Sequence, residues 1–210
     1  VVAQDRGVRG TLRVRALELI AGDARTWTTH VEYGLRYRVD VARAYFSPRL
    51  GSERLRVAEQ VARGERVADP FAGVGPYAIL IAKRREPARV IASDANPVAV
   101  ELLRQNVSTN RAERVEVREG DARTVLRESA PLDRVVLDLP HSALDFLPDA
   151  LRVLSPRGTV HLYGIVEMAD REDRATSVRQ AVEDSGRRVA GVGLPVVRAY
   201  SPSQHHGAFD

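Results

Sequence analysis

Cysteine is absent from the 210 residues of this sequence, which excludes disulfide bonds, thiolate metal sites and cysteine nucleophiles. Lysine is almost absent as well, because Lys83 is the only one. No apolar run approaches the roughly 20 residues that a membrane-spanning helix needs. Asp5, Arg6 and Arg9 interrupt any apolar core of a signal peptide at the start. We therefore expect a cytoplasmic protein with no membrane contact, and we expect no bound metal.

The length leaves room for one α/β domain and a small additional element. Hydrophobic residues make up 44% and charged residues 29%, which is typical of soluble globular proteins. The net charge of +4 is carried almost entirely by arginine, whose planar fork suits phosphate groups and guanine edges. A GC-rich genome produces the same arginine bias, so the charge by itself does not establish an RNA partner.

The N-terminal part is predicted to be a small β-rich element. Apolar and polar positions alternate from residue 11 to residue 40, and the stretches 30–33 and 35–41 form a predicted hairpin around Gly34. Its apolar content is too small for independent folding, so it must pack on the rest of the chain. We expect a β-rich element at residues 1–46, a linker and helix at 47–64, and the main domain at 65–210.

Strands and helices alternate in the rest of the chain. Predicted helices cover residues 53–63, 76–84, 97–110, 145–154 and 171–185, and predicted strands cover residues 66–69, 89–94, 115–118, 134–139 and 159–166. Ser52 is expected to cap the first helix and Asn96 the third, which has Pro97 at its first position. Such alternation implies right-handed crossovers and a parallel sheet.

The tail predicts a different pairing. Residues 188–194 and 197–200 read as two strands joined by Leu194-Pro195, and this connection is too short for a helical crossover. The two strands should therefore pair antiparallel. We predict a Rossmann-like α/β fold whose mainly parallel, seven-stranded sheet ends in an antiparallel hairpin, which is typical of class I S-adenosylmethionine (AdoMet) methyltransferases.

A glycine-containing loop joins the strand 66–69 to the helix that begins at Pro76. Gly73 and Gly75 allow the backbone to approach a ligand at the carboxyl end of the sheet. A dinucleotide site would have a third glycine and a free helix N-terminus for pyrophosphate, whereas Pro76 removes one N–H donor. The pattern favours a nucleoside without phosphates, such as AdoMet with Asp69 near its amino group; the alternative is a tight turn of small residues. The predicted cofactor-binding residues of this loop are Asp69, Phe71, Ala72, Gly73, Val74 and Gly75.

Acidic residues follow the next two strands as well. Asp94 ends the second strand, where an acid accepts hydrogen bonds from ribose hydroxyls. Asp121 closes the third, where the adenine amino group would lie, although it could equally cap a helix. Asn96 is expected to be structural as a cap, yet close to the cofactor. The predicted cofactor-binding residues here are Asp94, Ala95, Asn96, Gly120, Asp121 and Ala122.

The segment Asp138-Leu139-Pro140-His141 follows the fourth strand. In base methyltransferases a short polar-x-Pro motif at this place holds the target base against the methyl sulfonium. Positioning of this kind supplies much of the catalysis of an in-line displacement. We expect Asp138 and Pro140 to act in this way, with Asp138 also beside the cofactor. The alternative for Asp138 is capping a helix near Ser142, and His141 is expected to lie on the surface.

Together these motifs resemble the archaeal and eukaryotic tRNA (guanine-N1)-methyltransferases, which modify the guanosine immediately 3′ of the anticodon. The resemblance runs from about residue 10 to the C-terminus. It is carried by the segments 29–34 (THVEYG), 40–50 (DVARAYFSPRL), 69–76 (DPFAGVGP), 138–143 (DLPHSA) and 197–202 (VRAYSP). It implies an enzyme that binds AdoMet and the anticodon stem-loop of tRNA and methylates N1 of the guanine at position 37. We expect a monomer.

The resemblance also implies roles for residues that the motifs leave unassigned. Guanine N1 carries a proton that must leave before the nitrogen attacks a methyl group, and Glu53 matches the family's proposed general base. Arg13 matches an arginine thought to stabilise negative charge on guanine O6. Without the resemblance, Glu53 reads as a favourable acid in a first helical turn and Arg13 as a solvated strand residue. Phe46, Ser47 and Arg49 are expected to help enclose AdoMet.

Two features depart from the family pattern. The family usually has asparagine where this chain has Asp138; an amide donates and accepts hydrogen bonds, whereas a carboxylate only accepts. Beside Glu53, a second carboxylate would raise one of the two pKa values. The family also has a small N-terminal domain that contacts the outer corner of the tRNA, and this sequence begins after it, so weaker tRNA binding is expected. The alternatives are methylation of a tricyclic wyosine precursor, aminocarboxypropyl transfer, another substrate, or an RNA-binding remnant without turnover.

Overall fold

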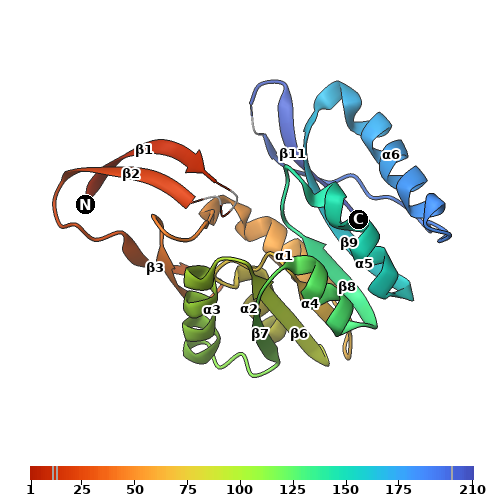
Figure 1. Ribbon diagram of the computed structural model, residues 1–210, viewed down its shortest axis with the longest axis horizontal. Coiled ribbons are helices and arrows are strands. Elements are labelled where there is room, and N and C mark those ends of the chain that lie inside the picture. Colours follow the sequence, from red (N-terminus) through yellow and green to blue (C-terminus); the bar gives the residue numbers. More distant parts are fainter. Residues whose placement is uncertain (11, 13, 200) are drawn as a thin grey trace.

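A seven-stranded sheet forms the centre of the molecule in the computed structural model, which describes residues 1–210 except 11, 13 and 200 (Figure 1). Its strands are β5 Arg66–Asp69, β6 Arg89–Asp94, β7 Val115–Glu119, β8 Leu132–Leu137, β9 Leu154–Glu167, β10 Val196–Ala199 and β11 Gln204–Phe209. They lie in the order β10-β11-β9-β8-β5-β6-β7. β5 to β9 pair parallel, whereas β11 pairs antiparallel with both β9 and β10. The predicted α/β class and its antiparallel ending are confirmed.

Helices cover both faces of this sheet. The helices are α1 Gly51–Gln60, α2 Pro76–Arg84, α3 Pro97–Thr109, α4 Ala122–Ser129, α5 Leu147–Val153 and α6 Arg171–Asp184, with short 3-10 turns η1 Pro48–Leu50, η2 Ala143–Phe146 and η3 Met168–Asp170. α1, α2 and α3 pack into one apolar cluster, which includes Ile79 and Leu103. α4, α5 and α6 pack into a second cluster, which includes Leu126 and Val178.

The central strands divide their side chains between these two clusters with a period of two. In β6, Val90 and Ala92 belong to the first cluster, while Ile91 between them belongs to the second. Successive strand residues point to opposite faces, so a strand buried on both faces is apolar throughout rather than alternating. This burial explains why these short runs, rich in valine and isoleucine, form parallel strands.

The N-terminal region contains two separate hairpins. β1 Val2–Arg9 pairs with β2 Val14–Ala21, and β3 Trp27–Glu32 pairs with β4 Leu35–Asp40. β1 and β2 extend away from the main body (Figure 1). β4 instead packs on α3, with Tyr37 and Val39 completely buried. Asn106 of α3 fixes this contact, because its side chain accepts a hydrogen bond from Arg38 N at 2.7 Å and donates to Arg38 O at 3.0 Å.

The tail differs from the prediction. Residues 188–194 were expected to be a strand, but the hairpin is formed by β10 and β11, and the segment 188–194 has no regular structure. The prediction was wrong because Gly191 and Gly193 disfavour a strand. Backbone hydrogen bonds still hold this part of the chain to β11 and the residue after it. Gly193 N donates to Asp210 O, Asp210 N donates to Gly193 O, and Ala208 N donates to Pro195 O.

Several local predictions also need correction. α1 begins at Gly51, so Ser52 lies inside the helix and does not cap it. The buried face of α1 carries the charged residues Glu53 and Arg54 beside Val57 and Ala58. α4 was missed because its pattern is short and polar. β8 begins and ends two residues earlier than expected, and β9 is longer at both ends.

Among the described residues, no helix is both long and apolar enough to cross a membrane.

Candidate active site

A cavity of about 600 Å³ opens where β5, β6, β7 and β8 end. Loops after parallel strands meet at this edge of an open α/β sheet, which is where such folds bind ligands. Most of the predicted site residues lie together on its wall: Phe46, Ser47, Phe71, Ala72, Gly73, Asp94, Ala95, Asn96, Gly120, Asp121, Ala122, Asp138 and Pro140.

The other predicted site residues lie elsewhere. Arg49 is exposed on η1, and Glu53, Asp69, Val74 and Gly75 are not on the described wall of the cavity. Arg13, expected to stabilise charge on guanine O6, lies outside the described residues, as does Tyr200 of the segment 197–202.

The two glycines of the loop after β5 have different surroundings. Gly73 has a φ angle of +54° and lines the cavity, so its lack of a side chain exposes backbone to a ligand. Gly75 has a φ angle of +93°, and a Cβ atom there would overlap Leu103 Cδ1 and approach Ile79 Cδ1 to 3.1 Å. Gly75 therefore allows α2 and α3 to pack closely, which places the loop indirectly.

Asp94 organises this loop from the end of β6. Its Oδ2 accepts a hydrogen bond from Gly73 N at 2.8 Å, and its Oδ1 accepts one from Asn96 N at 2.8 Å. Asn96 caps α3 by accepting a bond from Val98 N at 3.0 Å and donates to Arg43 O at 2.7 Å. The predicted structural role of Asn96 is confirmed, and it also holds the segment that leads to the cavity residues 45–47.

Three carboxylates are crowded at this edge of the sheet: Asp94 and Asp138 line the cavity, and Asp69 lies behind its described wall. Asp69 is completely buried, and neither of its oxygens makes a hydrogen bond of normal geometry within the described part of the chain. Burial, followed by the neighbouring charges of Asp138 and Asp94, raises the pKa of Asp69 well above its usual value, although the N–H groups of Phe71 and Ala78 oppose the shift. Burial also raises the pKa of Asp94. A ligand with positive charge would relieve this crowding.

Asp121 serves as a helix cap and lines the cavity as well. Its Oδ1 accepts hydrogen bonds from Arg123 N at 2.9 Å and Thr124 N at 3.4 Å at the start of α4. Both interpretations of this residue therefore fit the structure. A contact with adenine stays a prediction.

The loop after β8 brings Asp138 and Pro140 to the cavity. A tight turn with a bond from Leu139 N to Leu137 O at 2.9 Å begins this loop. Ser142 occupies the N-cap position of the following turn, η2, and no side-chain cap bond is formed there. The loop thus presents a carboxylate and a proline to the cavity, and His141 is exposed as expected.

A buried ion pair that the motifs did not predict positions the 47–50 side of the cavity. Arg54 is 2% exposed and donates to Glu32 through Nε at 2.8 Å and Nη2 at 2.5 Å. It also donates to Ser47 O at 3.2 and 3.3 Å, and its guanidinium lies over the ring of Phe46 at 5.4 Å. The only signal in the sequence was two opposite charges in otherwise apolar surroundings, Glu32 in a strand and Arg54 in a helix.

An aromatic wall was also missed. Phe71 and Phe146 meet edge to face with centroids 4.9 Å apart, and the Arg123 guanidinium lies 4.2 Å from the Phe146 centroid. All three line the cavity, together with Tyr77. Phe146 and Arg123 belong to no recognisable motif, so only the fold places them here. Planar rings and a guanidinium are suited to stacking on a nucleobase.

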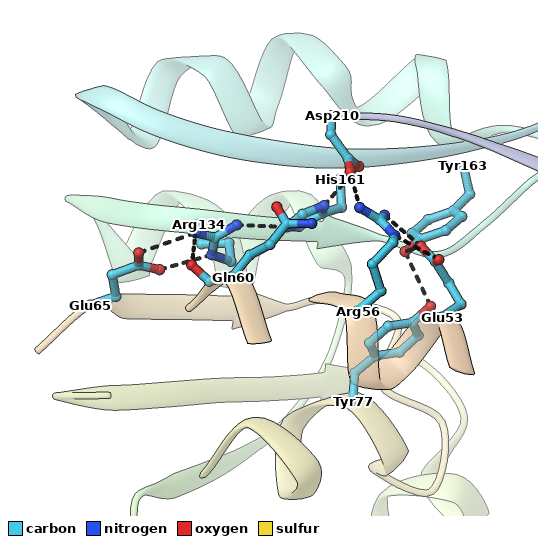
Figure 2. Close-up of polar contacts among 9 residues, drawn as sticks. All are labelled: Glu53, Arg56, Gln60, Glu65, Tyr77, Arg134, His161, Tyr163 and Asp210. Carbon is cyan, nitrogen blue, oxygen red and sulfur yellow. Dashed lines mark hydrogen bonds and ion pairs between the residues drawn. The ribbon is translucent and has the colours of Figure 1, made fainter. Parts of the chain in front are cut away.

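Glu53 is not on the described wall of the cavity but belongs to a buried polar network (Figure 2). Its Oε1 accepts from Tyr163 Oη at 2.6 Å and from Arg56 Nη2 at 2.6 Å, and its Oε2 accepts from Arg56 Nε at 2.8 Å. Glu53 is 5% exposed and Tyr163 is 2% exposed. Glu53 is therefore more than a favourable acid in a first helical turn, because Arg56 and Tyr163 both bind its carboxylate. Its role as general base stays a prediction.

No group of three or more histidine, cysteine, aspartate or glutamate side chains suited to a metal occurs in the described part of the chain.

The strand order, the ligand-side loops and the antiparallel ending together define a Rossmann-like class I methyltransferase domain. The model of the family described as "TRM5/TYW2 methyltransferase domain" matches residues 28–189. The chain therefore belongs to the TRM5/TYW2 methyltransferase family.

Relatives with curated names agree with this assignment. The chain is 38% identical over 204 residues to tRNA (guanine(37)-N(1))-methyltransferase Trm5b of Pyrococcus abyssi, a match that covers 97% of this chain and 60% of that protein. It is 34% identical over 210 residues to tRNA 4-demethylwyosine(37)-methyltransferase Taw21 of Saccharolobus solfataricus, covering 100% of this chain and 78% of that protein. The chain thus spans about three fifths of Trm5b.

Solved structures show the same fold. The crystal structure of Trm5b from Pyrococcus abyssi superposes with a TM-score of 0.87 at 36% identity, covering 99% of this chain and 62% of that chain. M. jannaschii TYW2 in complex with AdoMet superposes with a TM-score of 0.83 at 28% identity, covering 92% of this chain and 88% of that chain.

Proposed function

We propose that this domain binds AdoMet and transfers its methyl group to N1 of the guanine at position 37 of tRNA. The observation that carries the proposal is the cavity at the strand ends, which gathers the glycine loop, Asp94, Asp121 and Asp138 on one wall. Trm5b, which matches 97% of this chain and of which the chain covers 60%, is named for this reaction.

The residues of the cavity fit AdoMet. AdoMet supplies a methyl group on a positively charged sulfur and carries an ammonium group as well. The oxygens of the buried Asp69 make no hydrogen bond of normal geometry within the described part of the chain. With Asp94 and Asp138, which line the cavity, Asp69 forms an acidic cluster that a cationic ligand would neutralise. Asp94 and Asp121, which line the cavity, would accept hydrogen bonds from ribose and adenine, and Phe46 and Ser47 would help enclose AdoMet. Binding of AdoMet to the TYW2 relative supports this assignment.

The guanine is assigned to the side of the cavity formed by the loop after β8. Asp138 and Pro140 would hold the base, and Asp138 would accept a hydrogen bond from its N1–H or its amino group. The chain's contribution is positional, because an in-line displacement requires N1, the methyl carbon and the sulfur to be aligned. Arg13 would stabilise negative charge on O6, and Glu53 would finally hold the proton from N1.

A second candidate is methylation of a tricyclic precursor of wyosine at the same position. Taw21, of which the chain covers 78%, is named for methyl transfer to 4-demethylwyosine. Asp138 favours this second substrate, because an aspartate in place of the family's asparagine changes the hydrogen bonds offered to the base.

The test is methylation of defined tRNA. The protein is incubated with AdoMet and unmodified tRNA transcripts that have guanosine at position 37, and the digested nucleosides are analysed by mass spectrometry. N1-methylguanosine is expected, and none with a matched transcript that has adenosine there. Absence of methyl transfer to the guanosine transcript would refute the proposal. Methylation only of tRNA carrying 4-demethylwyosine would establish the second candidate.

Glu53→Gln tests the assignment of the proton acceptor. The amide keeps the shape of the side chain but cannot take up the proton, so methyl transfer should slow by about 100-fold or more. AdoMet affinity, measured by calorimetry, should change by less than about twofold, because Glu53 is not on the described cavity wall. Transfer at the wild-type rate would remove Glu53 from the mechanism.

A further inference from the structure

The position of Glu53 leaves a gap between the assigned proton acceptor and the cavity. Tyr77 lines the cavity, whereas Glu53 and Tyr163 are not on its described wall. All three are buried, being 3%, 5% and 2% exposed. A base inside the cavity can therefore contact Tyr77, whereas the Glu53 carboxylate lies behind the described wall.

Two tyrosine hydroxyls, one after the other, connect the cavity wall to the Glu53 carboxylate. Tyr77 Oη donates to Tyr163 Oη at 3.2 Å, and Tyr163 Oη donates to Glu53 Oε1 at 2.6 Å (Figure 2). Both bonds point in the same direction, from the cavity toward the carboxylate. Each hydroxyl can accept one proton on its oxygen while it passes on its own. The chain of donors and acceptors is therefore continuous and correctly oriented.

The far end of the chain is fixed by charge. Arg56 donates twice to Glu53, and it also binds Asp210. These bonds with Glu53 and Asp210 raise the pKa of Arg56 above its usual value, so it remains charged. Arg56 therefore holds the Glu53 carboxylate in place at the far end of the chain of hydrogen bonds.

Asp210 is fixed in turn by a buried histidine. His161 is completely buried and donates from Nδ1 to Asp210 Oδ1 at 2.8 Å, because its Nε2 must accept from Arg134 Nη1 at 2.7 Å. Arg134 also binds Glu65 at 2.8 and 3.1 Å. Each partner of Glu53 thus has a second partner of its own, which limits movement of the carboxylate (Figure 2).

We propose that the proton of guanine N1 leaves the cavity through Tyr77 and Tyr163 and ends on Glu53, a relay that rests on the proposed function. The N1–H bond breaks and a new O–H bond forms at Tyr77, whose own proton moves to Tyr163, whose proton moves to Glu53 Oε1. The electron pair of the N1–H bond stays on N1 and forms the bond to the methyl carbon. The electron pair of the carbon–sulfur bond stays on sulfur, which becomes neutral. Tyr77 is then a catalytic residue, and Tyr163 acts through it.

The surroundings keep both hydroxyls protonated at rest. Burial, followed by the charge of Asp138, raises the pKa of Tyr77 well above its usual value. Burial, Tyr77, Glu53 and Asp138 raise the pKa of Tyr163 in the same way. The ring of His206 in β11 lies 5.4 Å from that of Tyr163, and Arg54 of α1 opposes the shift at Tyr77. A stable tyrosinate is therefore disfavoured, and the protons must move together.

The experiment compares Tyr163→Phe and Tyr77→Phe with the wild-type chain in single-turnover methyl transfer to the guanosine transcript. Phenylalanine keeps the ring and removes only the hydroxyl. Each variant should transfer the methyl group about 100-fold more slowly at neutral pH, with AdoMet affinity unchanged within about twofold. Tyr37→Phe is the matched control, because Tyr37 is completely buried and its hydroxyl lies 3.5 Å from Pro76 O, outside the relay. It should react at the wild-type rate.

The pH profile separates a relay from a packing defect. Without the relay the N1 proton must leave to solvent, so the rate of Tyr163→Phe should rise in proportion to hydroxide concentration and approach the wild-type rate at high pH. The wild-type chain should show a curved proton inventory in mixtures of light and heavy water, as expected for several protons in flight. A loss by the same factor at every pH, or wild-type rates in both variants, overturns the relay. Failure of the wild-type chain itself to methylate would instead refute the proposed function.

Discussion

Gly75 and Gly64 both have positive φ angles, +93° and +82°, but their surroundings differ. A Cβ atom at Gly64 would meet no atom within 4 Å, whereas one at Gly75 would overlap Leu103. Gly64→Ala should therefore lower the free energy of unfolding by about 1–2 kcal/mol through backbone strain alone. Gly75→Ala should cost about 1–3 kcal/mol more through overpacking. Urea unfolding followed by circular dichroism measures both, and equal losses would contradict the packing role of Gly75.

Asp69 is a buried carboxylate whose charge is unfavourable without a cationic ligand. Its pKa is raised in the folded protein, so above the ordinary value of 3.8 the folded chain keeps a proton that the unfolded chain has lost. The free energy of unfolding therefore falls as the pH rises from 3.8 toward the raised pKa of Asp69. Asp69→Asn should remove that loss. The variant's free energy of unfolding should therefore exceed that of the wild-type chain by a margin that grows as the pH rises from acid to neutral.

Asp69→Asn should also weaken AdoMet binding by about tenfold or more, equivalent to ~1.4 kcal/mol, because Asp69 no longer adds its negative charge to those of Asp94 and Asp138 on the cavity wall. Asp23→Asn, at an exposed position in the turn between β2 and β3, is the control and should change neither property. An Asp69→Asn chain that is less stable at neutral pH, or that binds AdoMet normally, would contradict this account.

At the scale of elements, the pair of Arg54 and Glu32 joins α1 to β3 and thereby holds the 47–50 side of the cavity. Burial would raise the pKa of Glu32, but the hydrogen bonds and charge of Arg54 outweigh it and lower that pKa. Arg54→Met should cost about 3–5 kcal/mol of unfolding free energy, since it leaves a buried charge without its partner. Adding Glu32→Gln should recover much of that loss. A double-mutant cycle measures the coupling, and additive effects would show that the two side chains act independently.

How far each element could be predicted depended on whether its own residues carry a clear helix or strand signal. α2 and β6 were predicted at their observed bounds, because Pro76 sets the start of the helix and β6 is an apolar run that ends at an acid. The tail failed because β11 contains His205 and His206, residues with no strand signature, yet it occupies a central place between β9 and β10. Pairing with strands distant in sequence overrides such local preferences.

At the scale of the whole molecule, the net charge of +4 and the dominance of arginine predict how binding to RNA should respond to salt. If arginines neutralise phosphates, the logarithm of the affinity for an anticodon stem-loop should fall linearly with the logarithm of salt concentration. The slope should be about −0.7 to −0.9 for each phosphate contact. Fluorescence anisotropy at several salt concentrations measures it. A slope near zero would contradict an electrostatic contribution and favour a small-molecule or protein substrate.

The sequence by itself determined the class of fold and many of the residues on the cavity wall. Asp94 ends β6, Asp138 directly follows β8 and Gly73 lies in the loop after β5. Parallel strands bring their carboxyl ends to one edge whatever the rest of the chain does. Local order in the chain was therefore enough to predict that these residues meet.

Only the tertiary structure decided what surrounds Glu53. Tyr163 in β9, Tyr77 in α2 and Asp210 after β11 are far from Glu53 in sequence, and nothing in their spacing relates them. They meet because α1 packs against the sheet where β9 lies, so the buried acid must take its hydrogen bonds from whatever polar groups those elements carry. The physical reason is that a hydrogen-bond network depends on positions to within a few tenths of an ångström, which packing sets and periodicity does not.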